Sequence, residues 1–260
     1  MDSSKKKQRI FIVLTGIFLT NAILAEMIGV KIFSAEGTLG VAPANIKLLG
    51  GLVLDFNLTA GAVIWPVVFI TTDIINEYFG KKGVRQISFL AAGLIAYAFL
   101  VIWLVTKLAP ADFWLNVNAS DPEGNAFNIN YAFNVIFTQG MGIIVGSLTA
   151  FLIGQILDVY VFQSLRKITG EKKIWLRATG STLVSQLIDS FVVLGIAFYV
   201  FAPASTRWSL DQLFSVGLIN YIYKFAVAIL LTPLIYLGHY IIDSYLGQDA
   251  EKIKEEASLS

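Results

Sequence analysis

Two apolar stretches of the chain each carry a glutamine followed three residues later by an aspartate, Gln155 with Asp158 and Gln186 with Asp189. Residues three apart lie on one face of a helix, so each stretch presents an amide and a carboxylate side by side. A carboxylate within a membrane helix is costly, and it usually faces a bundle interior or a water-filled cavity on the path of a substrate or ion. The pattern therefore indicates a polar site inside a membrane domain.

The composition also indicates a membrane protein. Of the 260 residues, 56% are hydrophobic and 14% are charged, and the mean hydropathy is +0.71, whereas soluble domains are about 45–50% apolar and about 25% charged. The net charge of +1 gives no reason to expect a nucleic-acid partner. Because the chain has no cysteine and a single histidine, His239, we expect neither a metal site nor a cofactor.

The apolar runs predict an all-α membrane protein with six transmembrane helices, each near the roughly 20 residues that a bilayer requires. A polar segment, 1–9, precedes the membrane domain of residues 10–240, and a tail follows at 241–260, of which the charged part 248–260 is expected to be solvated. Segments 33–58 and 107–130 are predicted to be loops, the first with a hairpin or re-entrant piece. The predicted helices cover residues 10–30, 59–78, 87–105, 131–162, 178–201 and 213–240.

The distribution of positive charge predicts the orientation. Lysines and arginines are concentrated at the amino terminus, in the short loop 81–85 and in the loop 166–177. Positive charge marks the cytoplasmic side of a membrane protein, so both termini should be cytoplasmic. Few basic residues fall near the other side: Lys31, Lys47, Lys107 and Arg207.

Asp189 and Lys224 each fall near the middle of a predicted helix, so both belong near the bilayer midplane. They could form a structural ion pair that neutralises two buried charges, or they could line a cavity and contact a substrate or proton. Glu77, closer to the cytoplasmic end, is expected to be solvated or paired with a loop cation. Glu26, near the outer end, is expected to be solvated. The predicted substrate-binding residues are Asn21, Asp73, Gln155, Asp158, Gln186, Asp189 and Lys224.

No enzyme motif accompanies these residues. The sequence lacks the HExxH, GxSxG and GxxxxGK[ST] patterns of metalloproteases, serine hydrolases and phosphate-binding loops. An intramembrane aspartyl protease stays open as an alternative, because several aspartates are available. We predict that the protein is a transporter and not an enzyme.

Three segments resemble the queuosine precursor transporter family, also called the vitamin uptake transporter family: WPVVFITTDIINEYFG (65–80), the run 146–198 and NYIYKF (220–225). They contain a proline followed by a Thr-Asp pair, the sequence GQILDVYVF, a basic loop leading to Trp, Ser-Thr and Asp, and a lysine in the last helix. The resemblance spans nearly the whole membrane domain. The residues it singles out are Asp73, Gln155, Asp158, Arg177, Ser181, Thr182, Asp189 and Lys224.

The resemblance implies import of a 7-deazaguanine base, 7-cyano-7-deazaguanine or 7-aminomethyl-7-deazaguanine, across the inner membrane for queuosine synthesis in tRNA. Carboxylates and amides can read the guanine-like edge of such a base, and aromatic rings can stack on it. The expected partners are thus a purine-like small molecule and the lipid bilayer, with assembly into a homo-oligomer left open. The alternative is a substrate-binding membrane subunit of an energy-coupling-factor importer, which a separate ATPase module would power.

Overall fold

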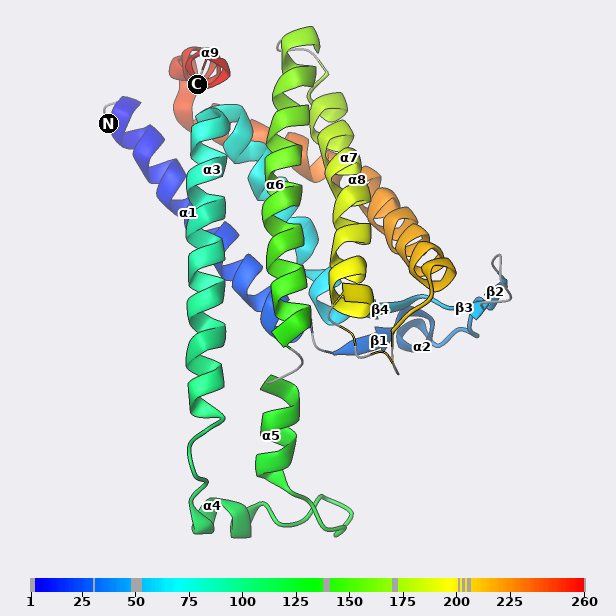
Figure 1. Cartoon of the computed structure of the whole chain (residues 1–260). Helices are drawn as coiled ribbons and strands as arrows, with labels where there is room; N and C mark the ends of the chain where they lie inside the picture. Colours follow the sequence, from blue (N-terminus) through cyan, green and yellow to red (C-terminus); the bar gives the residue numbers. More distant parts are fainter. Residues whose placement is uncertain are drawn as a thin grey trace.

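The computed structural model describes residues 3–29, 31–47, 53–137, 141–169, 173–200, 202, 204 and 207–259. Long helices dominate these residues, and the described ends of the chain lie close together at one end of the bundle (Figure 1). We call this the terminal end and the other the far end. Five described helices are long and apolar enough to cross a membrane, so the predicted all-α membrane class is confirmed.

The sequence predicts six spans and the structure has five such helices, because one helix joins two of the predicted spans. Helix α3 (Trp65–Val105) leaves helical geometry at Gly80, where φ is 64° and ψ is −165°. The chain reverses direction there, so the two arms of α3 run antiparallel (Figure 1). The predicted loop 81–85 is therefore wrong, since these residues are already helical. Essentially only glycine adopts this backbone conformation, and one glycine in it is enough to reverse the direction of the chain.

The other long helices alternate in direction along the bundle (Figure 1). Helix α1 (Ser3–Ile28) runs from the terminal end to the far end, and α6 (Met141–Thr169) runs back. Helix α7 (Ile174–Leu194) then descends and continues as the π-helix η3 (Gly195–Val200), and α8 (Leu210–Leu246) ascends. The predicted fourth helix is thus divided between α6 and the shorter α5 (Ile129–Phe137), while residues 138–140 lie outside the described part.

Two connections at the far end contain small elements. After α1, strand β1 (Ile32–Ser34) pairs antiparallel with β4 (Asn57–Thr59), and β2 (Ile46–Lys47) pairs with β3 (Val53–Leu54). The hairpin predicted within segment 33–58 is thus present, although residues 48–52 are outside the described chain. The other elements are α2 (Ala35–Leu39), η2 (Ala60–Val63) and, after α3, α4 (Asp112–Val117).

Glu36 ties the first of these connections together. Its side chain accepts a 2.7 Å hydrogen bond from the backbone N–H of Phe56 and a second from the Ser34 hydroxyl. Donation by the Phe56 N–H holds the pKa of Glu36 below its usual value. An ionised carboxylate thus links both ends of the connection between α1 and α3.

Part of the charged tail packs against the bundle. After α8, a turn of 3₁₀-helix, η4 (Gly247–Asp249), leads into α9 (Ala250–Ser258), which folds back against α3. Ile253 and Ala257 are buried there. The prediction of a solvated tail is wrong for one face of this short helix, because apolar residues four apart give it a buried side, while most of its charged residues are exposed.

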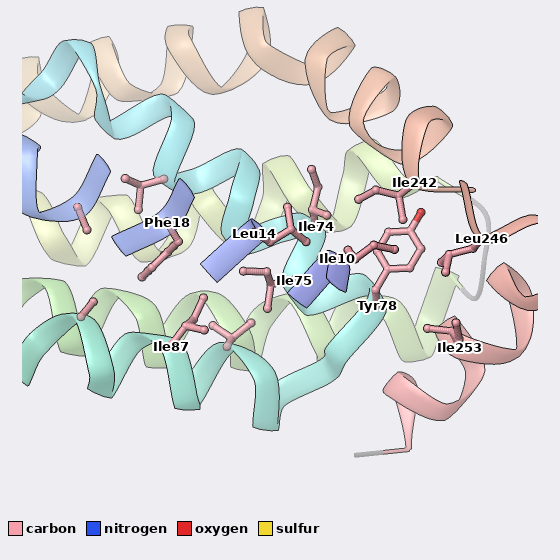
Figure 2. Packing of buried hydrophobic residues seen from close by; sticks show 14 of the residues in the cluster. Ile10, Leu14, Phe18, Ile74, Ile75, Tyr78, Ile87, Ile242, Leu246 and Ile253 are labelled. Carbon is pink, nitrogen blue, oxygen red and sulfur yellow. The ribbon is translucent and has the colours of Figure 1, made fainter. Parts of the chain in front are cut away.

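The main hydrophobic core joins α1, both arms of α3 and the end of the chain. On α1, Ile10, Leu14 and Phe18 recur every fourth residue and face Ile75 of α3 (Figure 2). Ile253 of α9 belongs to the same cluster (Figure 2). Because this spacing places apolar side chains along one face of a helix, α1 presents a continuous apolar stripe to the core.

We expect Gly80→Ala to destabilise the protein by about 1–3 kcal/mol, because a Cβ atom makes this backbone conformation strained. Gly93→Ala, in the same helix, is the control, since Gly93 is helical and has no atom within 4 Å of an added Cβ. Denaturant unfolding of the purified protein in detergent measures both changes. Equal stability of the two variants would show that the reversal does not depend on a glycine conformation.

Candidate functional site

A cavity of about 310 Å³ lies among α1, α3, α6, α7 and α8. Most of its lining comes from the end of α1, both ends of α3, the middle of α6, the end of α7 and the first half of α8, and α5 and η3 add further residues. Because these helices alternate in direction, all of these parts lie at mid-depth or toward the far end (Figure 1). The volume is within the range of pockets that bind small molecules, about 300–1,000 Å³.

Five of the seven predicted binding residues line this cavity: Gln155, Asp158, Gln186, Asp189 and Lys224. The other two do not. Asn21 donates its amide N–H to the Ile17 carbonyl of its own helix at 2.8 Å. Asp73 is only 2% exposed, and it lies beside the cavity-lining Thr72.

An ion pair crosses the cavity wall between α7 and α8. Lys224 Nζ donates to Asp189 Oδ2 at 2.5 Å, and about a fifth of each side chain is exposed, 23% and 20%. The ion pair that was one of the two alternatives for these residues is therefore present. Since both partners remain partly accessible from the cavity, a bound molecule could contact either charge without unfolding the helices.

Glu26 was missed as a cavity residue, because the sequence placed it in solvent near the end of α1. It lines the cavity, and the Ser147 hydroxyl lies 2.6 Å from Oε1 and 2.7 Å from Oε2 of its carboxylate. The available signal was helical spacing: Glu26 follows the buried Ala22 by four residues, so it continues the packed face of α1.

Aromatic rings complete the wall of the cavity. Trp65 stacks on Phe69 with ring centroids 5.7 Å apart, and its ring centroid lies 5.8 Å from that of Phe151. All three rings line the cavity, as does Tyr223. The site therefore combines flat apolar surfaces with amides, carboxylates and an ammonium group, which suits a planar ligand with a polar edge.

The terminal end is closed by a buried charge cluster of Glu77, Arg166 and Arg177. Arg177 Nε and Nη2 donate to the two carboxylate oxygens of Glu77 at 3.0 and 2.5 Å, and both side chains are fully buried. Arg166 donates to the Glu77 carbonyl at 3.0 Å and to the Lys254 carbonyl of α9 at 2.7 Å. Glu77 was predicted to be either solvated or paired with a loop cation. It is paired with Arg177, which belongs to the predicted loop 166–177, and it is buried.

Further contacts fix α8 and α9 to this closed end. Tyr78 donates to Asp243 at 2.7 Å, and Lys254 reaches the same carboxylate at 3.4 Å. His239 is buried and stacks on Tyr78 with ring centroids 5.4 Å apart. Helices α3, α6, α7, α8 and α9 are therefore joined by polar contacts at the terminal end.

Comparison with known proteins decides the family. A family model described as "Putative vitamin uptake transporter" matches residues 59–238. The chain belongs to the vitamin uptake transporter family. The resemblance predicted from the sequence is confirmed.

Curated relatives of this vitamin uptake transporter carry a more specific name. The "Probable queuosine precursor transporter" of Bacillus subtilis is 32% identical over 202 residues, which cover 76% of this chain and 80% of the relative. The "Queuosine precursor transporter" of Escherichia coli is 28% identical over 177 residues, 68% of this chain and 70% of the relative. No solved structure matches.

Family membership and the apolar helices agree on the general class of the protein. It is a multi-pass transporter of the inner membrane and not an enzyme. The protease alternative is thereby set aside.

We expect Glu77→Gln to destabilise this vitamin uptake transporter by about 3–5 kcal/mol, because it leaves a buried guanidinium without its counter-charge. Glu256→Gln makes the same chemical change in the exposed Lys7–Glu256 pair and should cost no more than about 1 kcal/mol. Denaturant unfolding in detergent compares them. Similar stability of the two variants would mean that the charge cluster does not hold the terminal end together.

Proposed function

We propose that this transporter imports queuosine precursors, 7-cyano-7-deazaguanine, 7-aminomethyl-7-deazaguanine or both, to supply queuosine modification of tRNA. The curated relatives named for such precursors support this proposal. The observation that carries it in this chain is the composition of the cavity, where the Asp189–Lys224 pair and two glutamines face aromatic rings.

The chemistry of a deazaguanine base complements these groups. Its ring N–H and exocyclic amine can donate to a carboxylate, and its carbonyl oxygen can accept from an ammonium or amide N–H. Asp189 and Lys224 therefore offer the two charges that such an edge requires, while Gln155 and Gln186 can accept or donate. Trp65 and Phe151 supply surfaces on which the ring can stack. Binding would replace part of the ion pair with charge-assisted bonds to the ligand.

We further propose six membrane crossings, with both termini in the cytoplasm. The reversal at Gly80 supports this count, because each arm of α3 then makes one crossing. The concentration of lysine and arginine in 1–9, 81–85 and 166–177 supports the orientation. The cavity would then belong to the extracytoplasmic half and the buried charge cluster would close the cytoplasmic half, an arrangement that receives substrate from outside.

Uptake of labelled 7-cyano-7-deazaguanine and 7-aminomethyl-7-deazaguanine tests the proposal in cells unable to synthesise either base. We expect expression of this chain to produce uptake and to restore queuosine in tRNA, also in a host lacking any energy-coupling-factor ATPase module. Absence of both effects would contradict the substrate assignment. Uptake only when an ATPase module is present would favour the role of a binding subunit.

The ion pair can be tested in the same cells. Asp189→Asn and Lys224→Met should each reduce uptake about tenfold or more, since one lost charge-assisted contact of about 1.4 kcal/mol corresponds to a factor of ten. Asp211→Asn and Lys252→Met, at exposed positions, are the matched controls and should retain uptake. Full uptake by both cavity variants, at equal protein levels, would place the binding site elsewhere.

A further inference from the structure

We propose that Asp73 and Asp158 hold one proton between them and that this proton crosses the membrane with the substrate, which makes the protein a proton-coupled symporter. The inference rests on the proposed function for its transported molecule. It assigns to Asp73 a role that does not require contact with the substrate.

The two carboxylates lie at neighbouring levels of adjacent helices. The first arm of α3 and α6 both ascend toward the terminal end (Figure 1), and Gln163 of α6 donates to Asn76 of α3 at 2.7 Å, which fixes their relative height. Asp73 precedes Asn76 by three residues and Asp158 precedes Gln163 by five, so their levels differ by about 3 Å at 1.5 Å per residue. Thr72, the residue before Asp73, lines the same cavity as Asp158.

Neither carboxylate has a cation to neutralise it among the described residues. Asp73 is 2% exposed and Asp158 is 6% exposed, and Oδ1 of Asp73 is buried without a hydrogen-bond donor. Among the described residues, the donors to Asp158 are the hydroxyls of Ser185, at 3.4 Å, Ser181 and Thr182. Two buried carboxylates cannot both ionise at low cost when they are close together, so retaining a proton on one of them is the favourable state.

The charges on the surrounding helices are already engaged elsewhere. Glu77, one turn beyond Asp73 on its own helix, is matched by Arg177 from α7 and Arg166 from α6. From α1, the nearest acid is Glu26, which bonds Ser147 at the far end of the cavity. Around Tyr78 at the terminal end, α8 contributes His239 and Asp243, and α9 contributes Lys254 and its partner Glu251.

The position of the pair suits a coupling site. Asp158 lines the cavity, whereas Asp73 lies behind the lining and one helical turn from the buried charge cluster that closes the terminal end. A proton that enters from the cavity forms an O–H bond at the pair and neutralises one charge. When the terminal end opens, that O–H bond breaks and the proton passes to water on the inner side, so one proton accompanies each cycle.

Infrared spectroscopy of the purified protein tests the shared proton without any substrate. At neutral pH we expect the carbonyl stretching band of a buried protonated carboxylic acid, shifted in ²H₂O and lost or displaced in Asp73→Asn. Asp211→Asn, which changes an exposed carboxylate, should leave the band unaltered. Absence of the band in the wild type, or an identical band in Asp73→Asn, would overturn the proposal.

Proteoliposomes test the coupling. With labelled 7-cyano-7-deazaguanine, the wild type should accumulate label against its gradient when the outside is more acidic, and a protonophore should abolish this accumulation. Accumulation by Asp73→Asn should be at least tenfold lower than that of the wild type. The variant should still exchange internal unlabelled base for external labelled base, which would also show that it is folded. Accumulation that ignores the pH gradient, or that survives in Asp73→Asn, would overturn the proposal and leave the substrate assignment intact. If the wild type does not exchange the base at all, the proposed function fails, and the infrared band still decides whether the pair holds a proton.

Discussion

This structure depends on one constraint: the fully buried carboxylate of Glu77 must be neutralised. Glu77 lies within the bundle with no exposed surface, and ionised groups are tolerated there only when they are paired and hydrogen-bonded. Arg177 supplies a two-point contact and Arg166 adds further bonds to the backbone around Glu77 and to α9. The terminal ends of α3, α6, α7 and α9 must therefore meet at one point.

The remaining polar groups take their roles from that meeting point. With the helices joined at the terminal end, the cavity forms between mid-depth and the far end, where the Asp189–Lys224 pair stays partly accessible. Asp73 and Asp158 lie between the two regions, and no described cation is available to them. The three sets of carboxylates thus differ in their partners. Glu77 pairs with a guanidinium at the closed end, and Asp189 pairs with an ammonium group at the cavity wall. Asp73 and Asp158, between these, have each other. In the mechanism that we propose, these differences separate holding the fold, reading a ligand and carrying a proton.

The polar site was largely predictable, because a Gln–Asp pair three residues apart in an apolar run has few explanations in a membrane protein. The approximate depth of Asp189 and Lys224 also followed from counting residues along straight helices. Counting does not give the rotation of a helix about its axis, so Glu26 was assigned to solvent and Asn21 to the cavity. The reversal between the second and third predicted spans was expected, but as a loop at 81–85 and not at Gly80 alone, because a glycine that ends a helix looks the same in sequence as one that starts a loop. The burial of α9 depends on apolar residues spaced within a charged tail, a signal too short to stand out.

Direct binding to the purified protein tests the central claim that the cavity reads a deazaguanine base through Asp189 and Lys224. Isothermal titration with 7-cyano-7-deazaguanine and with 7-aminomethyl-7-deazaguanine should show saturable binding of at least one base to the wild type. That binding should be weakened about tenfold or more in both Asp189→Asn and Lys224→Met, in line with the loss of a charge-assisted contact. No binding of either base to the folded wild type, or unchanged affinity in both variants, would contradict the account.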